Sequence, residues 1–403
     1  MVKVCCSKIT FTIMNQGKYI FAQIMEHLLY TDFESCVLKY HGEKYVKSFS
    51  SHDQLLAMMF GQLSYRTSLR DVTACLSSHK QKLYHLGFRS DVALQTLSHA
   101  NEKRDYRVYQ MLAEILIEKT RKLYLHDSNI ANDLAGVCYA IDSSSIELCL
   151  NLFRWAPYVE TKGAVKLHLV MDLRGSIPAF FNMTSGKVND VNFLDDVVFE
   201  AGAFYVMDRG YVDFGRLHMI HAVGAYFVIR TKINIRMKRR YSNPVDKTTG
   251  VLSDQIVFLT GKDAMKRYPE TLRRVKYRDE ETNQVYVYLT NNFSVSSLSI
   301  ALLYKNRWKI ELFFKWIKQH LKIKVFWGHS ENGVKTQICI ALCSYLLVAL
   351  IKKRLCLKQS LYEILQILSV SLFDKTPLLE LFSDESLQGF IDSDRNTASL
   401  FDF

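Results

Sequence analysis

Two short apolar stretches, VCYAID at 137–142 and AFYVMD at 203–208, each end on an aspartate. Apolar runs of this length predict buried strands, so Asp142 and Asp208 are expected where two buried strands end. The carboxyl ends of strands in an open α/β sheet are where ligands bind, and a lone buried carboxylate is otherwise costly. For either aspartate alone, a helix cap or a structural ion pair explains the position as simply.

The residues around these stretches predict a sheet with helices inserted between its later strands. AVKLHLVMDL (164–173) and SIPAFFNM (176–183) predict a hairpin across an Arg-Gly-Ser turn. NDVNFLDDVVFEAG (189–202) and DFGRLHMIHAVG (213–224) predict capped helices, and AYFVIRTK (225–232) predicts another strand. The predicted order from 137 to 231 is therefore strand, strand, strand, helix, strand, helix, strand.

A third acid lies in a strongly basic segment, YKNRWKIELFFKWIKQHLKIK at 304–324, which contains seven Lys and Arg residues and only Glu311 as an acid. On a helical wheel of about 100° per residue, four polar residues fall within an arc of roughly 60° beside an apolar stripe: Tyr304, Arg307, Glu311 and Lys318. An alternative is a solvated helix face with an Arg307–Glu311 pair four residues apart.

Asp142, Asp208 and Glu311 together predict a catalytic metal site. Three carboxylates brought together repel one another, and divalent cations remove that penalty. Mg²⁺ prefers oxygen ligands, and two ions about 4 Å apart can activate a water or a 3′-hydroxyl and stabilise the leaving oxygen of a phosphodiester. We therefore expect these acids to be catalytic and to bind two Mg²⁺ ions, with Mn²⁺ able to substitute.

The overall charge agrees with a polyanionic partner. The 403 residues carry a formal net charge of +12, which indicates nucleic acid first and an acidic membrane surface second, with a generically basic protein as the alternative. The longest apolar run, ICIALCSYLLVALI at 338–351, is short for a bilayer span and predicts a buried core helix. No secretory signal is visible, and nine cysteines without a C-x-x-C pair are typical of a reduced cytosolic protein.

Several basic and aromatic residues are candidates for DNA contact. Arg307 and Lys318 suit phosphate binding, whereas Tyr304 could bind phosphate or anchor its helix. Trp308 could stack on an unpaired base, although core packing explains a tryptophan as well. The remaining candidates follow the second acid, lie on the basic helix or belong to the run IRTKINIRMKRR at 229–240, for which a solvated charge run is the alternative: Arg209, Lys315, Arg236, Lys238, Arg239 and Arg240.

Together these motifs resemble a family. Tyr304-x2-Arg307-x3-Glu311-x6-Lys318 is similar to the Y-R-E-K signature of a large group of bacterial insertion-sequence transposases of the DDE class. MDRGY, with Asp208, resembles that group's second-acid motif, and AIDSSSIEL, with Asp142, resembles its first-acid strand. The resemblance covers about residues 14 to 385.

The resemblance implies an α/β catalytic core that is RNase-H-like: three antiparallel strands, then alternating helices and strands. It also implies an all-α N-terminal domain that recognises terminal inverted repeats and a β-rich insertion before the Glu-bearing helix. The expected segments are an upstream extension (1–13), a helical DNA-binding domain (14–130), the first part of the core (136–232), the insertion (233–298), the Glu helix (299–330), C-terminal helices (331–385) and a polar tail (386–403).

The implied activity is cut-and-paste transposition by a homodimer on paired DNA ends. Metal-dependent cleavage at the ends of the element would be followed by attack of the freed 3′-hydroxyls on target double-stranded DNA. The expected location is the bacterial cytoplasm, at the nucleoid, without membrane contact. Two alternatives remain: a metal-dependent nuclease without strand transfer, and an inactive or repurposed DNA-binding protein.

Overall fold

The computed structural model describes residues 17–383 except 45, 126, 128–135, 160, 161, 232–234, 322 and 324. The chain forms two compact units. Residues 1–123 and 317–403 form the helical unit, and residues 124–316 form the sheet unit. The predicted extension at 1–13 and the predicted tail at 386–403 lie outside the described residues. The finer division into seven segments stays a prediction.

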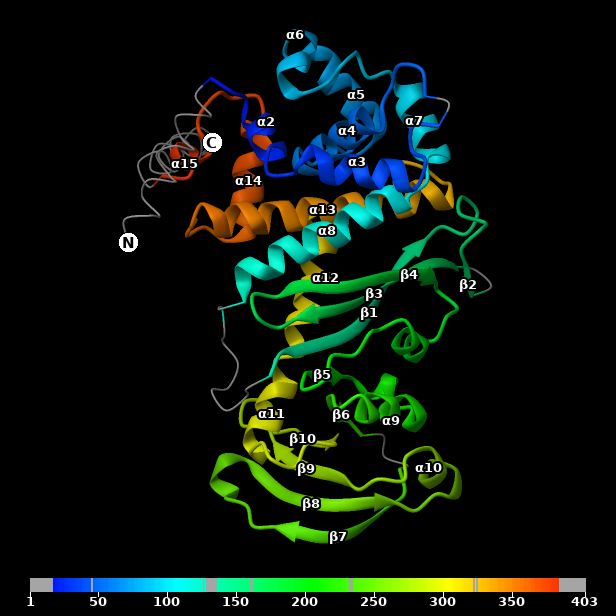
Figure 1. The fold of residues 1–403 in the computed structure, drawn as a ribbon, viewed down its shortest axis with the longest axis vertical. Coiled ribbons are helices and arrows are strands. Elements are labelled where there is room, and N and C mark those ends of the chain that lie inside the picture. The colour runs from blue at the N-terminus through cyan, green and yellow to red at the C-terminus, as the bar shows by residue number, and fades with distance from the viewer. Residues whose placement is uncertain are drawn as a thin grey trace, which may run out of the picture. The chain divides into compact units, whose positions relative to one another are not determined.

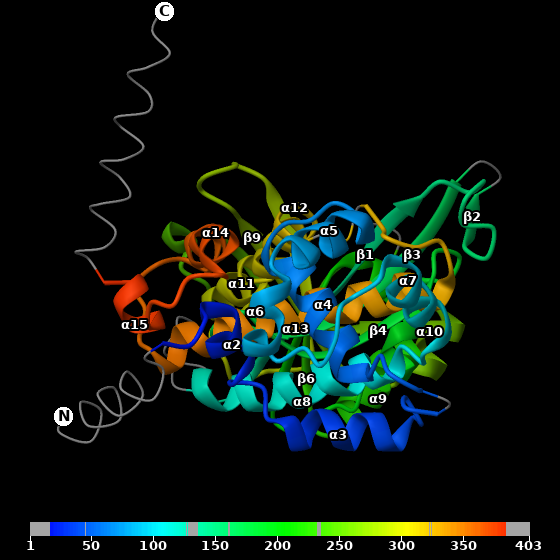
Figure 2. The ribbon, with the colours of Figure 1, turned by 90° about the horizontal axis from the view of Figure 1, so that it is seen from above.

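The helical unit joins the two ends of the chain around one buried helix, α13. The helices are, in chain order, α2 (Ile20–Met25), α3 (Tyr30–Lys39), α4 (Ser51–Leu63), α5 (Leu69–Ser78), α6 (Lys80–Leu83), η1 (Tyr84–Leu86), α7 (Leu94–Lys103), α8 (Arg107–Tyr124), α13 (Glu331–Arg354), α14 (Leu361–Ser371) and α15 (Leu378–Leu381). Helices α4, α7 and α14 pack against α13, and α8 runs beside it in both views (Figures 1 and 2).

Helix α13 is long and apolar enough to cross a membrane, but 94% of its most apolar window is buried in the protein. All residues from 338 to 351 are buried, so the prediction of a buried core helix is confirmed. Helix α4 begins with a capping box. Ser50 is the cap and forms a capping box with Asp53, whereas the Ser51 hydroxyl donates to the Gly42 carbonyl.

The sheet unit is built on one sheet whose order is β4-β3-β1-β5-β6-β10-β9-β8-β7, with β2 also paired to β3 (Figure 1). Strand β1 is antiparallel to β3 and parallel to β5, and β5 is parallel to β6. From β6 onward the neighbours are antiparallel. The region 233–298 is therefore β-rich as expected, and its strands continue the same sheet through the β6–β10 pair.

The strands and helices of this unit have the following bounds: β1 (Cys138–Leu148), β2 (Pro157–Val159), β3 (Lys162–Asp172), β4 (Ile177–Ser185), η2 (Asp190–Asp195), β5 (Phe204–Met207), η3 (Arg209–Tyr211), α9 (Phe214–Ala222), β6 (Tyr226–Arg230), β7 (Met237–Asn243), η4 (Lys247–Thr249), β8 (Val251–Leu259), α10 (Lys262–Arg267), β9 (Leu272–Arg278), β10 (Val285–Thr290), α11 (Ser297–Lys305) and α12 (Trp308–His320), the last of which continues into the helical unit.

Two predicted helices differ from the structure. The helix predicted over 189–202 is only the short η2, because Val197 and Phe199 instead pack against the core as irregular chain. The helix predicted over 304–324 is interrupted after Lys305. There the backbone bonds tighten to three-residue spacing, since the Arg307 N–H donates to the Tyr304 carbonyl and the Ile310 N–H to the Arg307 carbonyl, each at 3.0 Å. The Asn306 side chain also donates to the Leu302 carbonyl at 3.0 Å, and α12 starts at Trp308.

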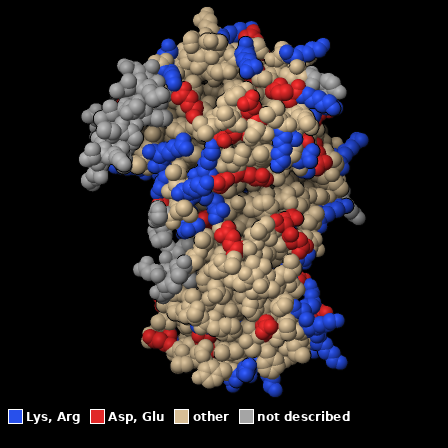
Figure 3. Space-filling model, in the orientation of Figure 1, with Lys and Arg blue, Asp and Glu red and all other residues tan. Residues whose placement is uncertain are grey.

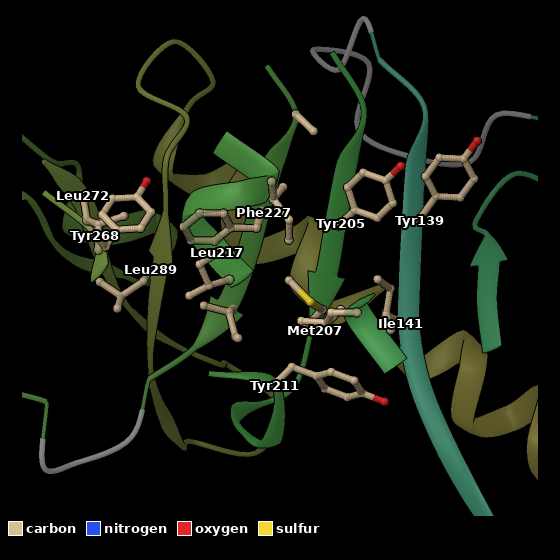
Figure 4. Close-up of a cluster of buried hydrophobic side chains, with 14 of the residues drawn as sticks. Tyr139, Ile141, Tyr205, Met207, Tyr211, Leu217, Phe227, Tyr268, Leu272 and Leu289 are labelled. Atoms are coloured by element: carbon tan, nitrogen blue, oxygen red, sulfur yellow. The ribbon is translucent and has the colours of Figure 1, made fainter. Parts of the chain in front are cut away.

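The core of the sheet unit lies between the sheet and α9 (Figure 4). Ile141 and Met207 are register partners on neighbouring strands, and both belong to this cluster together with Leu217 of α9. Helix α11 packs against β5 and β6, and in both views β6 lies between α9 and α11 (Figures 1 and 2). The sheet is therefore covered on both faces at its parallel strands, which is why those strands read as continuous apolar runs.

The β3–β4 turn gives a test of this packing. Gly175 has φ +71°, and a Cβ there would overlap the ring of Tyr124, whereas Gly202 has φ +79° with nothing within 4 Å of its Cβ position. We expect Gly175→Ala to lower the free energy of unfolding by about 2–4 kcal/mol, from the left-handed backbone and the overlap together. Gly202→Ala should lower it by only about 1–2 kcal/mol. Urea denaturation followed by circular dichroism measures both, and equal losses would mean that Tyr124 moves aside freely.

Candidate active site

Asp142 and Asp208 are placed next to each other by the register of two parallel strands. Ile141 pairs with Met207, so each aspartate is the residue that follows a paired position. Successive side chains alternate between faces of a sheet, and Ile141 and Met207 point into the core beneath α9. The two aspartates therefore lie on the opposite face, where α11 packs on β5 and β6.

The expectation that Asp142 ends its strand is wrong. Strand β1 continues to Leu148 because it keeps pairing with β3, from Ser143 opposite His168 to Leu148 opposite Gly163. Its pairing with β5 stops at Ile141, since β5 ends at Met207. Asp142 is thus the first residue of β1 with no partner on the β5 side, which opens space beside its carboxylate.

Asp208 directly follows β5, as expected, and caps the short helix η3. Its carboxylate Oδ1 accepts a hydrogen bond from the Gly210 backbone N–H at 2.7 Å. A Cβ on Gly210 would lie 2.9 Å from that oxygen, so the tight approach requires a glycine. Arg209, the next candidate, is exposed on η3.

Glu311 lies in the first turn of α12, and Arg307 joins it to Asp142. The Arg307 guanidinium donates from Nη1 to Asp142 Oδ2 at 3.2 Å and from Nη2 to Glu311 Oε1. The Arg307–Glu311 pair considered as an alternative is therefore present, but the same side chain also reaches a strand 165 residues away in sequence. Only 14% of the Arg307 side chain and 18% of the Asp142 side chain are exposed.

The electrostatics of the site centre on Asp142. Burial raises the pKa of the Asp142 carboxyl to about 6. The Ser143 backbone N–H and Arg307 oppose this rise, whereas the negative charges of Asp208 and Glu311 add to it. Burial alone would lower the pKa of Arg307, but Tyr304, Asp142 and Glu311 outweigh it and raise that pKa. Asp142 thus feels two neighbouring acids and one guanidinium.

Tyr304 and Trp308 line a pocket beside these acids. The pocket measures about 840 Å³ and combines aromatic rings with basic side chains and two acids. Its charged and aromatic lining consists of Arg230, Tyr277, Asp279, Glu281, Tyr286, Tyr288, Tyr304, Lys305, Arg307, Trp308 and Lys309. The Tyr304 ring lies 4.6 Å from the Tyr288 ring and 5.6 Å from the Arg307 guanidinium, and the Trp308 side chain is 58% exposed.

The other candidates lie on separate surfaces. Lys315 is exposed on α12, and Lys318 is on the part of α12 that belongs to the helical unit. Arg236 precedes β7, and Lys238, Arg239 and Arg240 lie exposed on it. Strand β7 is six places from β1 in the sheet, about 29 Å at 4.8 Å per strand. On the face seen in Figure 3, basic side chains gather at the end of the sheet unit that β7 forms.

A group of buried polar residues beside Asp142 was not predicted. Tyr211 is buried near Asp142, and burial raises the pKa of its phenol well above the ordinary value. Lys166 is nearly buried and pairs with Asp190 at 2.9 Å. Asp190 therefore forms an ion pair and is not the N-cap of η2, which is Asn189. The Asp-Arg-Gly-Tyr string contains Tyr211, so the sequence carried a signal for that residue alone.

Comparisons with known proteins agree on one group. Residues 134–347, more than half of the chain, match the family described as the transposase DDE domain, and residues 16–89 match a domain of unknown function, DUF4372. A Sinorhizobium fredii protein described as a transposase is 35% identical over 212 residues, 52% of this chain and 59% of that protein. A probable insertion-sequence transposase of Geobacillus stearothermophilus is 28% identical over 254 residues, 63% of this chain and 66% of that protein.

The chain thus spans less than two thirds of these two relatives. A solved structure, the piggyBac transposase synaptic complex with hairpin DNA, has a TM-score of 0.50 and 11% identity and covers 94% of this chain and 86% of that one. At that identity the likeness concerns the fold alone.

The raised pKa of Asp142 predicts a pH-dependent stability. The folded state holds this proton more tightly than the unfolded chain does, so ionisation above about pH 6 destabilises the fold. In chelator at about pH 7.5, Asp142→Asn should raise the free energy of unfolding by roughly 1–2 kcal/mol. The gain should shrink as the pH falls from about 6 and vanish well below the ordinary aspartate pKa of about 3.9, where the carboxyl is protonated in both states.

Asp213 is the matched control because its pKa is lowered. Burial would raise that pKa, but the Arg216 backbone N–H, Arg267 and Arg216 outweigh burial. Asp213→Asn should therefore destabilise the protein at about pH 7.5 and become neutral as the pH falls through the folded pKa. Denaturation curves across this pH range measure both variants. A change of the same sign in the free energy of unfolding of both variants would contradict the opposite pKa shifts of Asp142 and Asp213.

Proposed function

Because the chain belongs to the transposase DDE domain family, we propose that it cleaves DNA at the ends of an insertion sequence and transfers the freed 3′-hydroxyl ends into target DNA. The observation that carries this proposal is that Asp142 feels the negative charges of both Asp208 and Glu311. The three acids come from β1, the end of β5 and α12. Sites built from acids on separate elements suit phosphodiester chemistry better than structural pairing.

The proposed core is RNase-H-like. Strands β1, β3 and β4 are antiparallel neighbours, and β5 and β6 then extend the sheet in parallel from the other side of β1. The first acid lies on the first strand, the second follows β5, and the glutamate lies on a later helix. The likeness of the piggyBac fold supports this assignment.

The donor set fits Mg²⁺. Carboxylate oxygens are the ligands this ion prefers, and a raised pKa at Asp142 marks a desolvated carboxylate that a cation would stabilise. Among the residues that the structure describes, no three acidic, histidine or cysteine side chains are grouped closely enough to hold a metal ion. Asp142, Asp208 and Glu311 would hold the proposed pair of Mg²⁺ ions, with Mn²⁺ able to replace them. Bound there, the ions would activate water or a 3′-hydroxyl.

The chain's own residues would position the substrate. Tyr304 and Trp308 in the pocket beside the acids offer ring faces to bases, and Arg307 offers N–H groups to phosphate. Arg209 and Lys315 are exposed and would contribute phosphate contacts. Lys318 belongs to the same signature and would act as a point charge on a phosphate.

The remaining partners follow from the proposed reaction. Segment 14–130 would recognise the terminal inverted repeats, and a homodimer would hold the paired ends. The predicted location, the bacterial cytoplasm at the nucleoid, belongs to the same proposal. A basic strip on β7 would track the backbone of double-stranded DNA at a distance from the acids, since its bases are exposed on an edge strand.

The proposal predicts loss of cleavage without loss of binding in acid variants. Asp142→Asn, Asp208→Asn and Glu311→Gln should each slow metal-dependent cleavage of a labelled duplex carrying the gene's own flanking inverted repeat by about a thousandfold or more, as in other catalytic units. Asp263→Asn, on exposed α10, is the matched control and should cleave normally. The assay compares Mg²⁺, Mn²⁺ and chelator.

Each other outcome has a definite meaning. Binding of the duplex by the unaltered protein without any cut would favour the inactive DNA-binding alternative. Cutting without joining of the ends to target DNA would favour the nuclease alternative. Normal cutting by any one acid variant would remove that acid from the catalytic site.

The β7 strip makes a separate prediction. Replacing Lys238, Arg239 and Arg240 with Gln should weaken DNA binding and reduce the slope of log K against log salt by about 2.7, at about 0.9 per phosphate contact. The matched control replaces three exposed lysines elsewhere in the same unit, Lys247, Lys262 and Lys266. Fluorescence anisotropy over a salt series measures the slopes. Equal slopes for both triple variants would assign the strip to general solubility.

A further inference from the structure

The Arg307 guanidinium occupies the space between two of the proposed metal-binding acids. It donates to Asp142 Oδ2 at 3.2 Å and to Glu311 Oε1, so one cationic group bridges a strand and a helix. The guanidinium places a single positive charge where the proposed site would hold a divalent metal ion. A guanidinium and a divalent cation repel each other at such a distance.

The surroundings of Arg307 hold the guanidinium there in the DNA-free protein. Its side chain is 14% exposed, and its Nε is buried without a hydrogen-bond partner among the described residues. The Tyr304 ring lies 5.6 Å from the guanidinium carbon. The break between α11 and α12 places Arg307 in a turn, where a residue is less constrained than inside a helix. The inward position therefore leaves one buried donor of the guanidinium unsatisfied, which makes this position less favourable than a fully hydrogen-bonded one.

We propose that Arg307 is a positioning residue that keeps Asp142 and Glu311 paired and closed to divalent metal until a DNA phosphate draws its guanidinium away. This inference rests on the proposed function, because it concerns the same acids. A phosphate offers Arg307 a bidentate acceptor in place of the two carboxylates. The freed carboxylates then repel each other, and that repulsion favours a metal ion.

The consequence is a coupling between DNA binding and metal binding. Each ligand raises the affinity of the other by the same factor, because linkage is reciprocal. A free transposase with closed acids would hold little metal and would rarely nick DNA outside its own ends. Specificity for the element's ends would then have two sources: the DNA sequence that the protein binds, and the binding of metal to the acids only after that DNA is bound.

Mn²⁺ binding without DNA tests whether Arg307 keeps the acids closed to metal. Electron paramagnetic resonance measures free Mn²⁺ with the unaltered protein, Arg307→Gln, Arg307→Lys and Glu311→Gln, the last giving the binding that does not depend on Glu311. We expect Arg307→Gln to bind Mn²⁺ about 5- to 100-fold more tightly, the usual range of a coupling. Arg307→Lys keeps the charge without the two-carboxylate bridge and should fall between.

Lys262→Gln is the matched control for charge, because Lys262 is exposed on α10 of the same unit. Its removal should change the Mn²⁺ affinity by less than about threefold, as expected for a solvent-exposed and screened charge. Circular dichroism confirms that each variant is folded. Arg307→Lys keeps the test valid if Arg307→Gln unfolds.

Adding a duplex that carries the flanking inverted repeat tests whether DNA opens the acids to metal. This duplex should tighten the Glu311-dependent Mn²⁺ binding of the unaltered protein by about the same factor and leave that of Arg307→Gln nearly unchanged. Equal or weaker Mn²⁺ binding by Arg307→Gln than by the unaltered protein would overturn the inference and leave the proposed function standing. Absence of any Glu311-dependent Mn²⁺ binding, with and without DNA, would overturn both.

Discussion

The parallel pairing of β1 with β5 is the constraint on which the rest of the site depends. It stops at Ile141 and Met207, so the next residue on each strand is an aspartate on the face away from α9. A one-residue slip in this register would put the two carboxylates on opposite faces of the sheet and turn one of them toward the apolar core, where its burial would be far more costly. The same register leaves Asp142 unpaired on its β5 side and within reach of Arg307 from the turn before α12.

Local sequence patterns were enough to predict the elements that consist of one continuous apolar run. The apolar runs before Asp142 and Asp208 gave both strands and the position of Asp208. The continuation of β1 through Ser143–Ser145 could not be predicted, because this run is polar and has no apolar alternation. These residues are held in the strand by their pairing with β3. Strand β7 was missed for the same reason, since an exposed basic edge strand has no apolar alternation.

In the candidate site too, contacts between residues close in sequence could be predicted, whereas contacts between distant segments could not. The Arg307–Glu311 pair follows from a spacing of four residues, and the wheel anticipated it. The contact of Arg307 with Asp142 depends on the break at Asn306 and on a strand 165 residues away, which no local pattern encodes. The Lys166–Asp190 pair is likewise a product of tertiary packing, since it joins β3 to η2.

The β6–β10 pair joins the antiparallel meander of β10 to β7 to the parallel strands that carry the acids. Each neighbouring pair from β5 to β7 is hydrogen-bonded, so the basic edge at β7 and the strand before Asp208 belong to one continuous sheet. It also means that the meander is no detachable module. Cutting it out would bare the backbone groups of β6 along Tyr226–Arg230, an apolar edge prepared to pair with another chain.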